Sequence, residues 1–145
     1  MMDIREEIRE GLGGKILEWK EQSSRRVYFT IDKKDIIPTV ELLFRGLNLR
    51  FATASGIETP SGFEILYHFT LDKTGEFFSV RIFIKGKENP EVDSLAPLFP
   101  GAEWIEREMW EMLGIRFLGH PNLKHLLLVE DWPKNDYPLR QKNES

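Results

Sequence analysis

The sequence predicts an α+β domain, with an antiparallel or mixed sheet that has helices on one face, then a C-terminal helix and an extended, irregular tail. Segments rich in β-branched and aromatic residues are interspersed with segments whose apolar residues repeat at helical spacing. The chain has 145 residues, of which 41% are hydrophobic and 30% charged. This length and composition predict one globular domain with a buried core.

The N-terminal part alternates between the two kinds of segment. Asp3 and Asp32 can each cap a helix, because a carboxylate at this position accepts hydrogen bonds from backbone N–H groups of the first turn. The motif RVYFTI consists largely of residues that favour strands. The expected elements are a helix over residues 3–11, strands over residues 16–19 and 26–31, and a helix over residues 33–45.

Three further strands are expected in the middle of the chain. In the second of them, large apolar residues alternate with other residues, as in a strand that buries one face. Asp72 to Gly75 has the composition of a hairpin turn and separates the last two strands. The expected strands cover residues 49–55, 63–71 and 77–85.

The character of the chain changes after these strands. A polar connector is followed by a short helical segment over residues 92–98, a helix over residues 102–113, and one apolar run over residues 126–129. We therefore divide the chain into a sheet domain at residues 1–90 and a helix with a partner-docking tail at residues 91–145, which belong to one structural unit.

Composition excludes several classes of function. The net charge of −4 argues against nucleic acid as the main partner. The chain has no cysteine, which excludes disulfides, a thiol nucleophile and an iron–sulfur cluster with cysteine ligands. No apolar run is long enough to cross a membrane and no secretory signal is recognisable, so contact with a membrane is expected only through a partner.

The helix over residues 102–113 carries the most distinctive residues. An apolar stripe for the core is expected on one side of this helix, and a ladder of charges that are spaced four residues apart, and can therefore pair, on another. Trp104 and Trp110 lie outside the stripe, and tryptophan is enriched in binding sites. The stripe consists of Ile105, Met109, Met112 and Leu113, and the ladder of Glu103, Arg107 and Glu111.

A Gly-His-Pro turn at residues 119–121 follows the helix. His120 could act as a metal ligand or a proton relay, but a turn histidine bonded to the backbone is the favoured interpretation. His68 and His125 complete no common metal-binding spacing. The carboxylates Glu106, Glu108 and Glu111 are not accompanied by a catalytic motif, so we expect no catalysis from them.

The last residues suggest an arm that lies along another surface. Pro133 and Pro138 favour extended backbone, Trp132 and Tyr137 could anchor the arm, and Arg140 could bind a carboxylate with two hydrogen bonds.

These residues resemble a known family. The order Glu106-Arg107-Glu108, Glu111, Gly114-Ile115-x-Phe117-x-Gly119-His120-Pro121-x-Leu123 and the closing Tyr137-Pro138-Leu139-Arg140 is similar to the signature of the 30-kDa subunit of respiratory complex I, known in bacteria as the C subunit of NADH:quinone oxidoreductase. The same subunit recurs in energy-converting membrane-bound nickel–iron hydrogenases and sulfur reductases, and the short tail resembles that branch more closely. The chain departs from the family at Lys124 and His125, where arginines are usual.

The resemblance implies a non-catalytic structural subunit of the peripheral arm of a membrane-bound oxidoreductase, at the cytoplasmic face. Its partners would be the large subunit (the 49-kDa or hydrogenase-large-like chain) and the small iron–sulfur subunit. Iron–sulfur clusters, and a nickel–iron centre or quinone, would reside in those partners, and no catalytic, cofactor or metal-binding residue is expected in this chain. The expected docking residues are Glu106, Arg107, Glu108, Glu111, Gly119, His120, Pro121, Trp132, Tyr137 and Arg140.

Two other functions are open from the residues alone. One is a small stand-alone metalloenzyme that uses His120 with Glu108 or Glu111. The other is an adaptor domain of a different complex, with the tail as its peptide arm.

Overall fold

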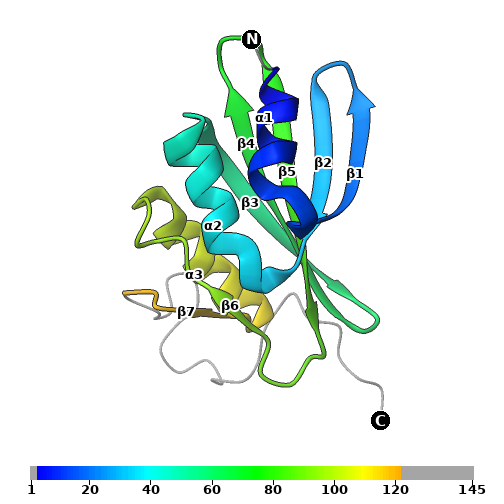
Figure 1. The fold of residues 1–145 in the computed structure, drawn as a ribbon. Coiled ribbons are helices and arrows are strands. Elements are labelled where there is room, and N and C mark those ends of the chain that lie inside the picture. The colour runs from blue at the N-terminus through cyan, green and yellow to red at the C-terminus, as the bar shows by residue number, and fades with distance from the viewer. Residues whose placement is uncertain (1–2, 122–145) are drawn as a thin grey trace. The chain divides into compact units, whose positions relative to one another are not determined.

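The structure is a computed structural model that describes residues 3–121. Its helices and strands follow the sequence prediction in most of the chain (Figure 1). The elements are α1 (Ile4–Leu12), β1 (Ile16–Ser23), β2 (Arg26–Ile31), α2 (Ile36–Glu41), β3 (Arg50–Thr59), β4 (Gly62–Leu71), β5 (Glu76–Lys85), β6 (Glu91–Asp93), α3 (Gly101–Leu113) and β7 (Arg116–Leu118).

The main sheet has five strands in the order β1-β2-β5-β4-β3. β1 and β2 are antiparallel and place Trp19 opposite Phe29. β2 and β5 are parallel, with Arg26 opposite Phe77, and this pairing makes the sheet a mixed one. The predicted α+β class with a mixed sheet is therefore confirmed.

The described chain forms two compact units. Within residues 3–121, unit 1 comprises residues 3–54 and 65–83, and unit 2 comprises residues 55–64 and 84–121. The strands β3, β4 and β5 run from one unit into the other. The division near residue 90 that we drew from the sequence stays a prediction.

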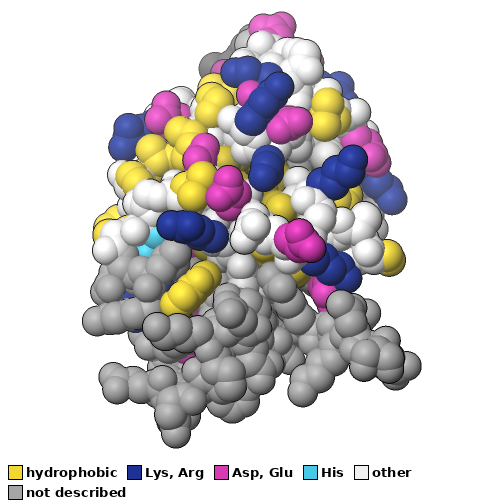
Figure 2. Space-filling model, turned by 90° about the horizontal axis from the view of Figure 1, so that it is seen from below, with side chains coloured by type: hydrophobic (Ala, Val, Ile, Leu, Met, Phe, Trp, Pro, Cys, Tyr) yellow, Lys and Arg dark blue, Asp and Glu magenta, His cyan; other side chains and the backbone are white. Residues whose placement is uncertain are grey.

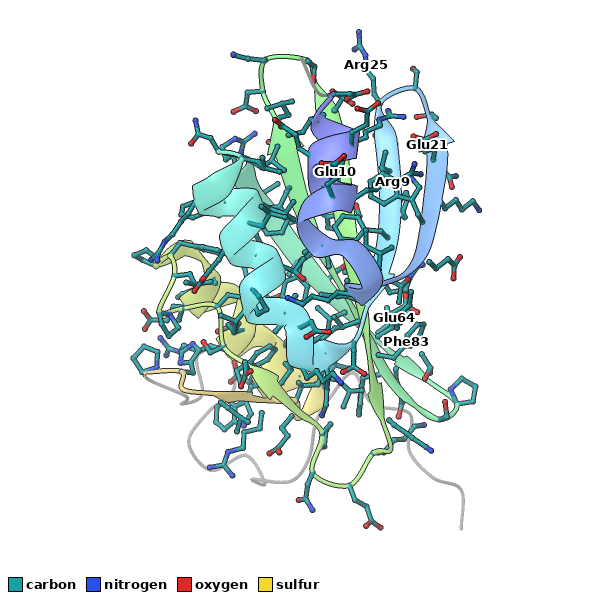
Figure 3. All side chains as sticks on the ribbon, in the orientation of Figure 1. Arg9, Glu10, Glu21, Arg25, Glu64 and Phe83 are labelled. Carbon is teal, nitrogen blue, oxygen red and sulfur yellow. The ribbon has the colours of Figure 1, made fainter. Side chains whose placement is uncertain are left out.

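In unit 1, α1 and α2 lie on the same face of the sheet (Figure 1). Arg9 reaches from α1 toward β1 (Figure 3), where its guanidinium carbon lies 4.3 Å from the ring centroid of Trp19. Trp19 in turn stacks on Phe29, with ring centroids 5.4 Å apart. The side chains that are fully buried in this unit include Ile8, Phe29, Ile31, Ile36, Leu43, Ile65, Tyr67, Phe69, Phe78 and Val80.

The N-cap predicted for α1 is confirmed. The side chain of Asp3 accepts a hydrogen bond of 3.1 Å from the backbone N–H of Arg5, and two glutamates in the first turn suit the positive end of the helix dipole. Gly13 ends the helix with φ of 53°, a conformation that glycine adopts without strain.

The helix predicted over residues 33–45 is not uniform. Asp32 accepts a hydrogen bond of 3.0 Å from the N–H of Lys34, as expected, but the first turn is a 3-10 turn. The α-helical part is short, and it opens into a π-helical turn over Leu42–Gly46. In that turn the N–H of Leu47 donates to the carbonyl of Leu42 at 2.8 Å, which is an i→i−5 bond.

Unit 2 contains α3 and a two-stranded parallel sheet of β6 and β7. The helix predicted over residues 92–98 is wrong, because Val92 lies in β6, opposite Phe117 of β7. Both side chains are buried, and the pairing of two segments distant in sequence outweighs local propensity. A strand of three residues is also too short to show the alternation of apolar and polar residues by which strands are recognised in a sequence. None of the described helices is both long and apolar enough to cross a membrane.

Arg5 joins three parts of unit 1. Its guanidinium group donates to Glu21 of β1 at 2.8 Å, to the carbonyl of Ser24 at 2.6 Å and to Glu76 of β5 at 3.3 Å. These bonds are charge-assisted, and the Arg5 side chain is only 18% exposed. Arg5 therefore holds α1 to two strands.

We expect Arg5→Ala to lower the free energy of unfolding by about 1–2 kcal/mol, because three carbonyl or carboxylate acceptors lose their donor. Urea denaturation followed by circular dichroism measures the change. Arg50→Ala is the matched control, since Arg50 pairs with Asp72 at 3.1 Å but both side chains are more than 60% exposed, at 61% and 65%. No measurable change is expected there, and equal losses in the two variants would contradict the assigned role of Arg5.

Candidate docking site

The helix α3 buries two of its sides. One buried side consists of Ala102, Glu106, Met109 and Leu113, and the other of Arg107 and Glu111. Within unit 2, Gly56 of β3 faces the first side, where an added Cβ would lie 3.1 Å from both Met109 and Leu113. The helix ends at Gly114, whose φ is 79° and whose N–H donates to the carbonyl of Trp110 at 2.8 Å.

The stripe that we predicted for the core of α3 is partly wrong. Met109 and Leu113 are buried as expected, but Ile105 and Met112 are only half-buried. Glu106 occupies the core side in their place, because its carboxylate finds hydrogen-bond donors there. A sequence pattern that assigns polar residues to the surface cannot anticipate such a position.

Glu106 fastens the loop after β6 to the middle of α3. Its Oε1 accepts a hydrogen bond from the hydroxyl of Ser94 at 2.5 Å, and its Oε2 accepts one from the N–H of Leu95 at 2.7 Å. The side chain is 1% exposed. Burial raises the pKa of Glu106 from 4.5 to about 7, although the hydrogen bonds from the loop favour the ionised form.

Sequence reasoning missed Ser94 as the partner of Glu106. The Ser94 hydroxyl also accepts a bond of 3.0 Å from the N–H of Ala96, and the Ser94 N–H donates to the carbonyl of Leu118 at 2.8 Å. Ser94 is therefore the junction of the β6 loop, β7 and α3. A serine before a turn is too common for sequence alone to have indicated this role.

Two of the three residues in the charge ladder on α3 are buried. Arg107 is 8% exposed and Glu111 is fully buried, whereas only Glu103 is half-buried. The Nε of Arg107 is buried and has no hydrogen-bond partner within the part of the chain that the structure describes. A buried guanidinium N–H without an acceptor is unusual.

The exposed edge of α3 is formed by Trp104 and Glu108, which are one turn apart. Trp104 is 56% exposed, which is a large fraction for so apolar a side chain. Glu108 is exposed as well, while Trp110 is half-buried. An exposed tryptophan beside a charged residue is the arrangement typical of a protein-binding surface.

The Gly-His-Pro turn is attached to the first half of α3. Gly119 has φ of 84°, and Pro121 is exposed. The Nε2 of His120 lies 2.8 Å from the backbone carbonyl of Glu103. Because a carbonyl oxygen only accepts hydrogen bonds, Nε2 carries the proton and donates it. His120 is thus bonded to the backbone, in agreement with the favoured interpretation of this residue.

A pocket of about 340 Å³ lies beside the end of α3. Its lining consists of residues 89–91, which lead into β6, and of Trp110, Gly114 and Arg116. The aromatic ring of Trp110 and the guanidinium group of Arg116 in this lining could receive one side chain of a partner.

No group of three His, Cys, Asp or Glu residues among residues 3–121 is placed to hold a metal ion. His120 and the two candidate carboxylates accordingly form no such group. Some of the predicted docking and signature residues lie outside the described residues, namely Leu123, Lys124, His125, the run over residues 126–129, Trp132, Tyr137 and Arg140.

Charges of both signs are mixed on the surface. Figure 2 shows Lys and Arg side chains interspersed with Asp and Glu, with hydrophobic side chains scattered between them. Among the described residues seen in that view, no extended patch of one sign is present.

Comparison with known proteins supports the resemblance seen in the motif. The C subunit of NADH-quinone oxidoreductase from Nocardioides sp. is 29% identical over 124 residues, which are 78% of this chain and 49% of that protein. A C subunit of the same enzyme from Rhizobium meliloti is 38% identical over 84 residues, covering 58% and 40% of the two chains. The C/D subunit of Photorhabdus laumondii is 32% identical over 127 residues, covering 84% and 21%. The chain thus spans half or less of the length of these relatives.

Two solved structures share the fold. One is described as the membrane-bound sulfane sulfur reductase, an archaeal respiratory membrane complex, and matches with a TM-score of 0.82 and 20% identity over 93% of this chain and 80% of that chain. The other, a trypsin-resistant fragment of Nqo5, matches with a TM-score of 0.66 and 20% identity over 84% of this chain and 100% of the fragment. The model of the family described as "Respiratory-chain NADH dehydrogenase, 30 Kd subunit" matches residues 29–144. The chain therefore belongs to the family of the 30-kDa subunit of respiratory-chain NADH dehydrogenase.

Proposed function

We propose that this chain is a non-catalytic structural subunit in the peripheral arm of a membrane-bound respiratory oxidoreductase. It binds the large catalytic subunit and holds it beside the small iron–sulfur subunit. The observation that carries the proposal is the exposed edge of α3, where Trp104 is 56% exposed next to the exposed Glu108. Such an edge fits binding to a protein better than it fits catalysis.

The support of α3 favours a fixed binding surface. Glu106 ties the loop after β6 to the helix, and His120 ties the turn after β7 to the carbonyl of Glu103. A surface held at two points loses little conformational entropy when a partner binds. The same two contacts involve Glu106 and His120, two residues of the family signature.

The redox centres belong, on this proposal, to the partner subunits. Iron–sulfur clusters, and a nickel–iron centre or a quinone, are carried by the large and small subunits. The absence of cysteine from the chain supports this division of roles, because a cluster with cysteine ligands has no ligand here. The complex holds the chain at the cytoplasmic face of the membrane.

Reversing one charge on the exposed edge tests the proposal. A tagged chain with Glu108→Arg is expected to recover the large and iron–sulfur subunits from solubilised membranes in amounts reduced roughly tenfold or more, because a charge of the wrong sign then faces the partner. Glu10→Arg is the matched control, since Glu10 is also an exposed glutamate on a helix and lies on α1 (Figure 3). Quantitative mass spectrometry of the recovered subunits gives the measurement.

The result separates docking from folding. Both isolated variants are expected to melt at the temperature of the wild type, because each substitution is at an exposed helical position. Failure of the unaltered chain to recover either partner would overturn the proposed function. If the Glu108→Arg and Glu10→Arg chains recover equal amounts of the partner subunits, the exposed edge of α3 is not part of the docking surface.

A further inference from the structure

One strip of α3 is buried although it faces away from the core side of the helix. This outward strip is formed by Glu103, Arg107 and Glu111. At about 100° per residue, the three lie roughly 100° to 180° around the helix from the buried Ala102. Arg107 is 8% exposed and Glu111 is fully buried, whereas Trp104, just beyond the strip, is 56% exposed. A cover therefore lies over the outward strip and stops short of Trp104.

The contacts already described for α3 belong to its core side. Gly56 of β3 faces Met109 and Leu113 there, and the carboxylate of Glu106 accepts hydrogen bonds from the loop after β6, beginning at Ser94. These contacts explain why the core side is buried, but not why the opposite side is. Because the structure contains a single chain, the cover of the outward strip comes from this chain itself.

The buried charges of the outward strip indicate what kind of cover it needs. A charged side chain that is removed from water requires hydrogen bonds or an opposite charge close by. The Nε of Arg107 is buried and has no hydrogen-bond partner within residues 3–121. The cover must therefore provide an acceptor for Arg107 as well as apolar surface for the aliphatic part of its side chain.

The chain reaches the start of this strip at the Gly-His-Pro turn. The Nε2 of His120 donates to the backbone carbonyl of Glu103 at 2.8 Å, so the chain leaves the described part beside the first residue of the strip. Glu111 is two turns further along α3, about 12 Å away at about 1.5 Å per residue. An extended chain covers about 3.3 Å per residue, so roughly four residues after His120 suffice to pass along the whole strip.

The sequence that comes next has the composition that the cover needs. Residues 122–131 read NLKHLLLVED, in which an apolar run follows the basic pair of Lys124 and His125 and precedes the acidic pair of Glu130 and Asp131. The basic pair comes four and five residues after His120, the length of chain that reaches Glu111. Backbone carbonyls and the acidic pair offer acceptors for a guanidinium group.

We propose that residues 122–131 bind along the outward strip of α3 in the same chain, with the basic pair at Glu111 and the apolar run over the strip. A partner subunit or a second copy of the chain would cover the strip only after assembly, whereas the strip is already buried in the single chain. The inference leaves Trp104 and Glu108 as the exposed edge of α3, and it holds whether or not that edge docks a partner.

Thiol labelling of the full chain tests the inference, because a chain without cysteine gives an introduced thiol no competitor. Arg107→Cys places the thiol in the outward strip, and Glu108→Cys, at the exposed neighbouring position, is the matched control. The Arg107→Cys thiol is expected to react with a maleimide roughly tenfold more slowly than the control thiol, since a covered thiol is poorly accessible. Adding Leu126→Asp and Leu128→Asp to each variant should release the cover and make the two rates similar.

A disulfide test does not depend on whether the aspartate variants fold. Glu111→Cys combined with Lys124→Cys is expected to form a disulfide within one chain on mild oxidation, because this bond requires Cα atoms within about 7 Å of each other. Ile105→Cys combined with Lys124→Cys is the matched control, since Ile105 lies roughly 120° around α3 from Glu111. Mass spectrometry of tryptic peptides measures the yield of each disulfide.

Several results would overturn the inference. One is rapid labelling of the Arg107→Cys thiol in the otherwise unaltered chain, and another is slow labelling that persists in folded aspartate variants. Equal disulfide yields in the two cysteine pairs would also reject it, and a disulfide that joins two chains would assign the strip to a second copy. All these measurements use the isolated chain, whereas the proposed function is tested by recovery of partner subunits, so either can fail without the other.

Discussion

The contribution of Glu106 to the free energy of unfolding is expected to fall by about 3 kcal/mol as the pH rises from 4.5 to about 7, and Glu106→Gln is expected to remove this contribution. The pKa of Glu106 is raised from 4.5 to about 7 in the folded protein, chiefly by burial. The folded state therefore holds this proton more firmly than the unfolded state does. Each pKa unit corresponds to about 1.4 kcal/mol, which gives the expected size.

The sign of the effect follows from the two states of the carboxyl group. Below pH 4.5 the group is protonated in both states, so the stabilisation from its raised pKa is fully present. Between 4.5 and about 7 the unfolded state loses the proton first, and the free energy of unfolding decreases. Urea denaturation at a series of pH values measures the free energy of unfolding.

His68 requires the comparison to be made as a difference between variants. Burial and the charge of Arg26 lower the pKa of His68, so the unfolded state binds that proton more firmly and stability rises with pH through the range below 6.5. Subtracting the Glu106→Gln profile from the wild-type profile cancels this contribution. Parallel profiles for the two proteins would contradict the assignment to Glu106, and Glu108→Gln, on the exposed edge of the same helix, should keep the wild-type profile.

Gly62→Ala is expected to lower the free energy of unfolding by about 3 kcal/mol. Gly62 begins β4, and a Cβ at this position would overlap the backbone carbonyl oxygen of Ile84 and lie 2.9 Å from the N of Gly86. These are backbone atoms, so no side-chain rotation relieves the overlap. The hydrogen bond of 2.7 Å from the N–H of Gly86 to the carbonyl of Ser61 holds the two segments together.

Gly14→Ala is the matched control for this substitution. A Cβ at Gly14 would meet no atom within 4 Å, and Gly14 is exposed. We expect its stability to equal that of the wild type or to exceed it slightly, because alanine reduces the entropy of the unfolded chain. Thermal melting compares the stability of the Gly62→Ala and Gly14→Ala variants. Equal melting temperatures would show that the contact between β4 and the end of β5 is not tight.

Local signals were sufficient for the elements that depend on local chemistry. Asp3 caps α1, RVYFTI forms β2, and Leu71 accepts hydrogen bonds from Thr74 and Gly75 in the predicted hairpin turn. The helix over residues 102–113 is confirmed as α3 with one residue more at its start. In each case the deciding interaction lies within a few residues of the signal.

Distant contacts account for what the sequence did not reveal. The short strands β6 and β7 exist because Val92 and Phe117 meet, although their segments are separated by the whole of α3. Glu106 is buried because Ser94 and Leu95 provide donors, and a helical wheel contains no information about a loop.

The parallel pairing of β2 with β5 has a consequence for the protein during its synthesis. The hairpin of β1 and β2 is made first, yet the neighbour of β2 in the finished sheet is translated only after α2, β3 and β4. A two-stranded hairpin is marginally stable in water by itself, and its open edge can pair with other chains. The nascent chain therefore emerges from the ribosome with an unsatisfied β2 edge, and closing that edge is a long-range step that should limit the rate of folding.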